Sequence, residues 1–223
     1  MPPELPAILI AALTGFGSGF VISIPVGPVN LGIMNEGAQR GFKHAAWIGV
    51  GASVMELIYC SIAFTSFSNF FQNGYVKAGM EVFSFAFLMF LGMKFLLASS
   101  VPTPGPMEKH IQGKLHPRSP FMNGLVMVMG NPGVLLFWII LSVNFMSRGW
   151  VEPNMAGKGA CVLGVALGTS AWFTGLAYAA SLGHKKFSEK TLLRMERGSG
   201  ISLLLLGLAH GCHIAWQMVK HKL

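Results

Sequence analysis

The sequence has little charge of either sign and no aspartate at all. Charged residues make up 11% of the 223 residues, all eight acidic residues are Glu, and 52% of the residues are hydrophobic. A soluble domain carries about 25% charged residues, so this chain lacks the charge to cover an ordinary water-facing surface. Only three cysteines are present, which excludes a disulfide-rich secreted scaffold. Together with the mean hydropathy of +0.57, these shortages indicate an integral membrane protein.

Long apolar runs supply the spans of such a protein. A bilayer core of about 30 Å requires roughly 20 apolar residues in a helix. The period-two alternation of membrane β-barrel strands is absent. We therefore expect an all-α membrane protein with six transmembrane helices, at approximately residues 7–31, 45–67, 78–98, 121–146, 159–182 and 200–219.

The basic residues predict the orientation of these helices. Lys and Arg are enriched in cytoplasmic loops, and three loops on one side are much richer in them than the other side. The net charge of +8 therefore marks loops and needs no nucleic-acid partner, and both chain termini are expected outside. The richer side carries Arg40, Lys43, Lys109, Lys114, Arg118, Lys185, Lys186, Lys190, Arg194 and Arg197, with Lys94 nearby; the other side carries Lys77, Arg148, Lys158, Lys220 and Lys222.

A Pro- and Gly-rich linker at residues 99–120 divides the chain into residues 1–98 and 121–223, with three helices in each half. Because three is odd, the second half enters the membrane from the opposite side, so related halves form two inverted three-helix repeats. Short matches occur in the same order in both halves: Gly51-Ala52-Ser53 with Gly168-Thr169-Ser170, Leu91-Gly92-Met93 with Leu206-Gly207-Leu208, and Val26-Gly27-Pro28-Val29 with Gly130-Asn131-Pro132-Gly133.

Two helix breaks are the first candidate for a functional site. Pro25-Val26-Gly27-Pro28-Val29-Asn30 and Asn131-Pro132-Gly133 place helix-breaking residues inside apolar runs. Such breaks free backbone carbonyls and create half-helix N-termini, which favour a substrate carboxylate. The alternative is a simple kink. The matched pair favours a transport site that includes Pro25, Gly27, Pro28, Asn30, Asn131 and Pro132.

Glu56 is the second candidate, because it is the one Glu of the eight placed at mid-membrane. A carboxylate there costs about 2.5 kcal/mol or more, and Glu56 shares a helix face with the small residues Gly49 and Ser53. We therefore expect it to face the bundle interior, where it can load and release a proton as access alternates. A neutral Glu that serves packing is the alternative.

Other polar or small residues have simpler interpretations. Small residues four apart on the first, second and fifth helices predict close helix packing. Trp172 either lines a substrate cavity or fills the core. His210, His213 and Gln217 share one face, where a hydrogen-bonded core histidine is favoured over a metal site, and Glu81 and Lys94 are expected to snorkel at opposite ends of their helix.

The ordered motifs resemble the lysine exporter family (LysE/RhtB amino-acid exporters), whose members have six helices in about this length. The motifs that carry the resemblance are Pro25-Val26-Gly27-Pro28, Gly37, Arg40-Gly41-Phe42, Leu91-Gly92-Met93-Lys94, Phe121, Gly124, Asn131-Pro132, Arg197, Gly200 and Gly207. The sequence departs from the family pattern at two places: Val26 is an insertion in the first motif, and Gly133 replaces the Lys that usually follows Asn-Pro and that bears on substrate charge. A lysine substrate therefore does not follow.

We interpret the chain as a secondary transporter that exports amino acids or similar small metabolites across the bacterial inner membrane by proton antiport. Export rather than import is implied by the resemblance alone. Its expected partners are the small-molecule substrate and the lipid bilayer, with a homodimer left open. No enzyme, cofactor or metal motif is found. The alternatives are a heavy-metal exporter using His210, His213 and Glu56, and a thiol–redox carrier using Cys60 and Cys161.

Overall fold

The computed structural model describes residues 4–66, 74–100, 110–111, 114–115, 119–182 and 188–220. Most of the expected linker at residues 99–120 and the basic residues Lys185, Lys186 and Lys222 lie outside these ranges. The described residues contain helices and no strand. The helices are α1 (Glu4–Ser23), α2 (Pro28–Arg40), α3 (Phe42–Ser66), α4 (Gly74–Leu96), α6 (Pro120–Met129), α7 (Pro132–Ser147), α8 (Met155–Ser181) and α9 (Glu189–Val219).

Five of these helices are long and apolar enough to cross a membrane, and a sixth span is formed if α6 and α7 count as one bent pair. The axis turns by 67° between α6 and α7. Large apolar side chains are exposed on the outer faces, including Leu9 at 58%, Leu163 at 65% and Leu205 at 63%. This outer surface suits lipid, and the expectation of an all-α membrane protein with about six spans is confirmed.

Two expected helix boundaries are wrong. The first run was placed to end at residue 31, but after the expected break between Ser23 and Pro28 the helix α2 continues to Arg40. The sixth run was placed to start at residue 200, but α9 starts at Glu189, where the Ser188 side chain accepts a hydrogen bond from the Thr191 N–H. This cap lets the helix include basic residues that composition alone assigned to a loop.

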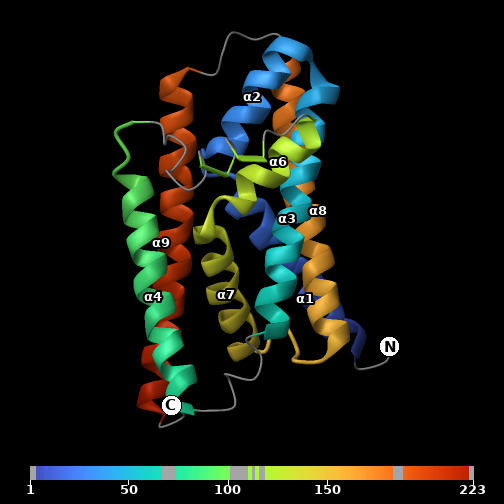
Figure 1. The fold of residues 1–223 in the computed structure, drawn as a ribbon. Helices are drawn as coiled ribbons and strands as arrows, with labels where there is room; N and C mark the ends of the chain where they lie inside the picture. Colours follow the sequence, from blue (N-terminus) through green and yellow to red (C-terminus); the bar gives the residue numbers. More distant parts are fainter. Residues whose placement is uncertain are drawn as a thin grey trace.

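The helices form two groups with α7 between them (Figure 1). α4 and α9 lie side by side as an antiparallel pair, while α1, α2, α3, α6 and α8 pack together on the other side. α7 contacts both groups, through α3 and through α4. Both ends of the chain lie at the same end of the molecule in Figure 1, as an even number of spans requires.

Glycines allow α1 to lie directly against α8. A Cβ on Gly15 or Gly19 would overlap the backbone of Cys161 or Val165, and a Cβ on Gly168 would overlap the Phe16 carbonyl. Small residues permit such close approach between helices in lipid. The packing interpretation of these stripes is therefore confirmed, except at Gly175, where a Cβ would meet nothing within 4 Å.

Candidate transport site

The first helix break lies between Ser23 and Pro28. Proline has no backbone N–H and fixes its own φ, so Pro25 cannot continue the hydrogen bonds of α1, whereas Pro28 fits the first turn of α2. Gly27 caps α2 in an extended conformation, without a side-chain hydrogen bond to the helix N-terminus. The first N–H groups of α2 are therefore free to bind another group.

Asn30 holds this break together. Its amide nitrogen donates to the carbonyl oxygens of Ser23, Ile24 and Pro25 at 2.8, 3.3 and 2.7 Å. Its amide oxygen accepts a hydrogen bond from the Trp172 indole at 3.3 Å. The side chain is only 2% exposed. Asn30 thus supplies partners for carbonyls that the end of α1 leaves unpaired.

The second break lies at Gly130 and Asn131. The Asn131 side chain accepts from the Gly133 N–H at 3.1 Å and so caps α7. The Tyr59 hydroxyl donates to the Met129 carbonyl at 3.0 Å, which ties the end of α6 to α3. Both expected breaks are therefore present, and each is held by a hydrogen bond from a neighbouring polar side chain.

A cavity of about 900 Å³ lies against both breaks. Its walls bring together seven of the eight residues expected at the site, namely Pro25, Gly27, Pro28, Asn30, Glu56, Asn131 and Pro132. Trp172 does not line the cavity; it lies behind Asn30. Lys94 and residues 97–100 line the cavity near the end of α4. Apolar side chains complete the walls, including Phe87, Leu91, Phe95, Phe137, Phe173 and Leu203.

Glu56 faces this cavity from the middle of α3. It is 5% exposed and accepts a hydrogen bond from the Trp138 indole on α7. Among the described residues, no basic side chain forms an ion pair with it. The expectation that Glu56 faces the bundle interior is confirmed. A buried carboxyl without a counter-charge is a group that can carry a proton.

Glu196 is a cavity residue that sequence reasoning missed. Its carboxylate accepts the Val26 N–H at 2.7 Å, although the two residues are 170 apart in the chain, and its side chain is 2% exposed. Glu56 is therefore not the one buried carboxyl that lines the cavity. The late start assigned to the sixth helix hid Glu196, because it placed this residue in a loop.

Glu81 is a third buried carboxyl, which corrects the expectation that it snorkels to water. It is fully buried and neither carboxyl oxygen has a hydrogen-bond partner. The ring of His210 on α9 contacts both the Glu81 carbonyl, at 3.1 Å, and the Arg148 guanidinium, at 3.2 Å. Burial lowers the pKa of Arg148, and the nearby Glu81 raises it.

The residues of the two alternative functions lie in different parts of the helix bundle. His210 is a hydrogen-bonded core histidine, as favoured, and no group of three or more His, Cys or Glu side chains in the described ranges could hold a metal ion. Cys60 and Cys161 lie on the neighbouring helices α3 and α8, and both are buried free thiols.

Broken helices that meet at a cavity are typical of secondary transporters, and comparison with known proteins agrees. A family model described as LysE type translocator matches residues 20–211. The chain belongs to this family. LysE translocators are transporters, and the expected family is therefore confirmed, together with a multi-pass membrane location and an exporter-type function.

Two curated relatives of this LysE translocator were found. It is 28% identical over 193 residues to the "Putative amino acid efflux protein YcgF" of Bacillus subtilis, a match that covers 86% of this chain and 91% of the relative. It is 27% identical over 145 residues to an uncharacterized membrane protein of Pseudomonas aeruginosa, covering 63% of this chain and 65% of the relative. No solved structure matches the chain.

Proposed function

We propose that this LysE translocator exports amino acids or similar small metabolites by proton antiport, and that the substrate binds in the cavity between the two helix breaks. The observation that carries the proposal is the cavity itself, because it joins a free half-helix N-terminus to buried carboxyl groups. An amino acid needs both, one for its carboxylate and one for its ammonium group. The name of the Bacillus subtilis relative supports the same substrate class.

The substrate carboxylate binds at the start of α2. The N–H groups there have no side-chain cap, and the helix dipole favours an anion at this end. Lys94 adds a positive charge to the same cavity. The start of α7 is less available, because the Asn131 side chain already accepts from Gly133. The first break is therefore the anchor for the carboxylate.

Glu56 binds either the substrate ammonium group or the coupling proton, one at a time. Glu56 is buried and the cavity wall also contains the apolar Phe137 and Phe173, so a charge on Glu56 is favoured when a cation lies beside it. Substrate and proton then compete for one carboxyl, which couples their movement in opposite directions. The aromatic walls accept the apolar part of the substrate.

Alternating access follows if the two halves of the chain are inverted repeats. In this scheme residues 1–98 and 121–223 are the repeats, and the substrate site lies between their broken helices. The cavity has Lys94 and residues 97–100 at the end of α4, the side that the basic loops assign to the cytoplasm. In the proposed cycle this cavity belongs to the inward-facing state.

The test is efflux from proteoliposomes loaded with a panel of radiolabelled amino acids under an imposed pH gradient. Glu56→Gln keeps the hydrogen-bond acceptor for Trp138 but cannot release a proton, so we expect efflux to stop responding to the gradient. Glu152→Gln, at an exposed carboxyl in the loop before α8, is the matched control and should behave as wild type. A variant with all three cysteines changed to Ala should also transport normally.

Two results would reject parts of the proposal. Gradient-driven efflux in Glu56→Gln equal to that of the wild type would remove the proton role of Glu56. Wild-type protein that moves no amino acid of the panel would remove the substrate class. Loss of activity in the cysteine-free variant alone would favour the thiol–redox alternative.

A further inference from the structure

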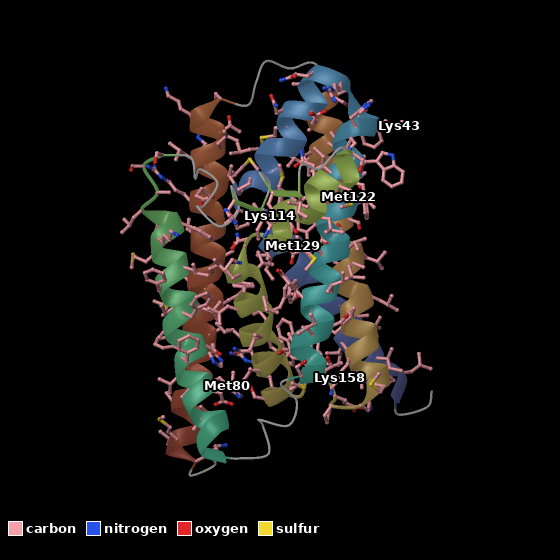
Figure 2. The ribbon with its side chains drawn as sticks, in the orientation of Figure 1. Lys43, Met80, Lys114, Met122, Met129 and Lys158 are labelled. Atoms are coloured by element: carbon pink, nitrogen blue, oxygen red, sulfur yellow. The ribbon has the colours of Figure 1, made fainter. Side chains whose placement is uncertain are left out.

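A buried cluster of ionisable side chains lies at the end of the helix bundle away from Lys94 and the cavity wall around it. Glu81 on α4 is fully buried, His210 on α9 is 1% exposed, and Arg148 follows the last residue of α7. Glu81 precedes Lys94 by 13 residues on α4, which is about 20 Å along a helix. Figure 2 shows Met80, the neighbour of Glu81, in the lower part of the molecule. The proposed transport mechanism leaves this cluster without a role.

The contacts of the cluster determine where the His210 ring carries its proton. A terminal guanidinium nitrogen of Arg148 lies 3.2 Å from the Nδ1 atom of His210. Because a guanidinium can only donate hydrogen bonds, Nδ1 is the acceptor and carries no proton. The ring proton is then on Nε2, which donates to the Glu81 backbone carbonyl at 3.1 Å. His210 is therefore neutral, with both ring nitrogens engaged.

The neutral ring ties the end of α7 to the α4–α9 pair. Among the described residues, His210 is the hydrogen-bond partner of the Arg148 guanidinium, and the Arg148 Nε atom has no partner. Arg148 also lies over the Trp150 ring, but Trp150 belongs to the same chain segment after α7. The hydrogen-bonded tie from this end of α7 to α9 thus depends on an unprotonated Nδ1 of His210.

We propose that His210 is a second proton-binding site of the transporter, and that a proton on its Nδ1 atom releases the end of α7 from α9. The added proton turns the acceptor into a donor and places a positive charge beside Arg148. The hydrogen bond to Arg148 is then lost, whereas the bond from Nε2 to the Glu81 carbonyl is kept. The role of this release in export rests on the proposed function.

The described charged and titratable groups that act on this site come from three helices. They are the Glu81 carboxyl on α4, the Arg148 guanidinium at the end of α7 and the His213 ring, one turn further along α9. Glu81 is the one acid among them, so it can offset the charge of Arg148 but not that of a second cation as well. His213 is half-buried and lies between His210 and the end of α9, the side from which a proton arrives.

This position suits proton antiport. The basic loops predict that the end with the cluster faces outside, where protons enter and substrate leaves in the proposed cycle. A proton that binds the released state better than the tied state shifts the population towards release. Loss of that proton restores the bond between His210 and Arg148 and ties the end of α7 again.

The test measures the separation of α7 and α9 as a function of pH. In the cysteine-free variant, spin labels are attached at Ser147→Cys, the last residue of α7, and at Met218→Cys, near the end of α9. Their distance is measured by double electron–electron resonance in lipid nanodiscs from about pH 8 to about pH 4.5, a range that includes the ordinary titration of histidine. We expect a second, longer distance whose population rises at least about tenfold as the pH falls, since a hydrogen bond to a charged group contributes at least that factor. A distance that is independent of pH would overturn the proposal.

His210→Asn separates the proton site from a purely structural contact. The carboxamide oxygen takes the place of Nδ1 and accepts from Arg148, but it does not bind a proton in this range. We expect the short distance at every pH, equal to that of the parent at high pH, which also shows that the protein is folded. His44→Asn, at an exposed histidine of α3, is the matched control and should keep the pH response.

Two further variants test the neighbouring titratable groups. Glu81→Gln and His213→Asn should each keep a pH-dependent distance, because neither change removes the Nδ1 atom of His210. A response that survives His210→Asn, or that either neighbouring variant abolishes, would overturn the assignment to His210.

The distance measurement uses no substrate, so its outcome is independent of which molecule is transported. Glu56→Gln should also keep the pH response, because Glu56 lies in the cavity and not in this cluster. A pH response without amino-acid efflux would support the role of His210 and reject the proposed substrate class. Efflux with a pH-independent distance would do the reverse.

Discussion

Two side chains hold the first helix break from opposite sides. Asn30 donates to the carbonyls at the end of α1, and Glu196 accepts the Val26 N–H. Each satisfies backbone groups that a broken helix leaves unpaired in a membrane, where water cannot replace them. Asn30 was expected to hold substrate, but its amide hydrogens are engaged by the chain itself. These two polar side chains therefore fix the backbone of the first break, where we propose that the substrate binds.

Asn30→Asp tests the bracing role of the amide. The change removes the N–H donors and places carboxyl oxygens against three carbonyls, while the acceptor for Trp172 remains. We expect unfolding to become easier by about 2 kcal/mol or more, measured as a lower Tm in detergent. Asn35→Asp on the same helix is the control, because Asn35 is exposed and its side chain only accepts from Gln39. Equal Tm values for the two variants would contradict the bracing role.

Glu196→Ala tests the second brace. It leaves the buried Val26 N–H without an acceptor, which costs about 1–3 kcal/mol. We expect a lower Tm and weaker substrate binding, since the position of Gly27 and Pro28 depends on Val26. Glu196→Gln retains an amide oxygen as acceptor and should keep most of the stability. The comparison is made by thermal unfolding and by equilibrium binding of the transported amino acid; an Ala variant as stable as the Gln variant would show that the bond is dispensable.

Individual helices were largely predictable from composition, and their ends were not. Apolar runs predict the spans because every helix needs about 20 apolar residues to cross the bilayer core. The prolines inside two of these runs predict both breaks. The start of α9 at Glu189 depends on a cap by Ser188, a local hydrogen bond that an apolar count ignores. That error hid Glu196.

Two glycines of α8 provide a matched test of helix packing. A Cβ on Gly168 would overlap the Phe16 carbonyl on α1, whereas a Cβ on Gly175, two turns later, would meet nothing within 4 Å. Gly168→Ala should therefore destabilise the protein by about 1–3 kcal/mol, and Gly175→Ala should be neutral or stabilise it by about 0.5–1 kcal/mol. The measurement is the Tm of each purified variant in thermal unfolding. A Gly168→Ala variant as stable as the wild type would show that α1 and α8 can separate at little cost.

The basic residues are distributed unevenly between the two ends of the molecule. Figure 2 shows Lys43 in the upper part of the molecule and Lys158 in the lower part, where the chain termini also lie in Figure 1. Among the described residues, the helix ends on the side of Lys43 carry more Lys and Arg than those on the side of Lys158. By the positive-inside rule we expect this end to face the cytoplasm, and the proposed transport cycle depends on that orientation.

Reporter fusions at the C-terminus test this orientation. If both termini lie outside, as the basic loops predict, alkaline phosphatase fused after Leu223 is active and green fluorescent protein fused there is dark. The matched fusion after Arg40, in the short connection between α2 and α3, should give the opposite pattern. A fluorescent C-terminal fusion would invert the topology and would make the described cavity face outward.

The amino-acid sequence by itself determined the membrane class, the approximate spans and the two breaks, because each depends on the composition of one continuous segment. Only the tertiary structure decided which side chains meet at the breaks. The contact of Glu196 with Val26 joins residues 170 apart, and the burial of Glu81 depends on the packing of α4 with α7 and α9. Such contacts depend on which helix faces turn towards each other, and no single segment contains that information.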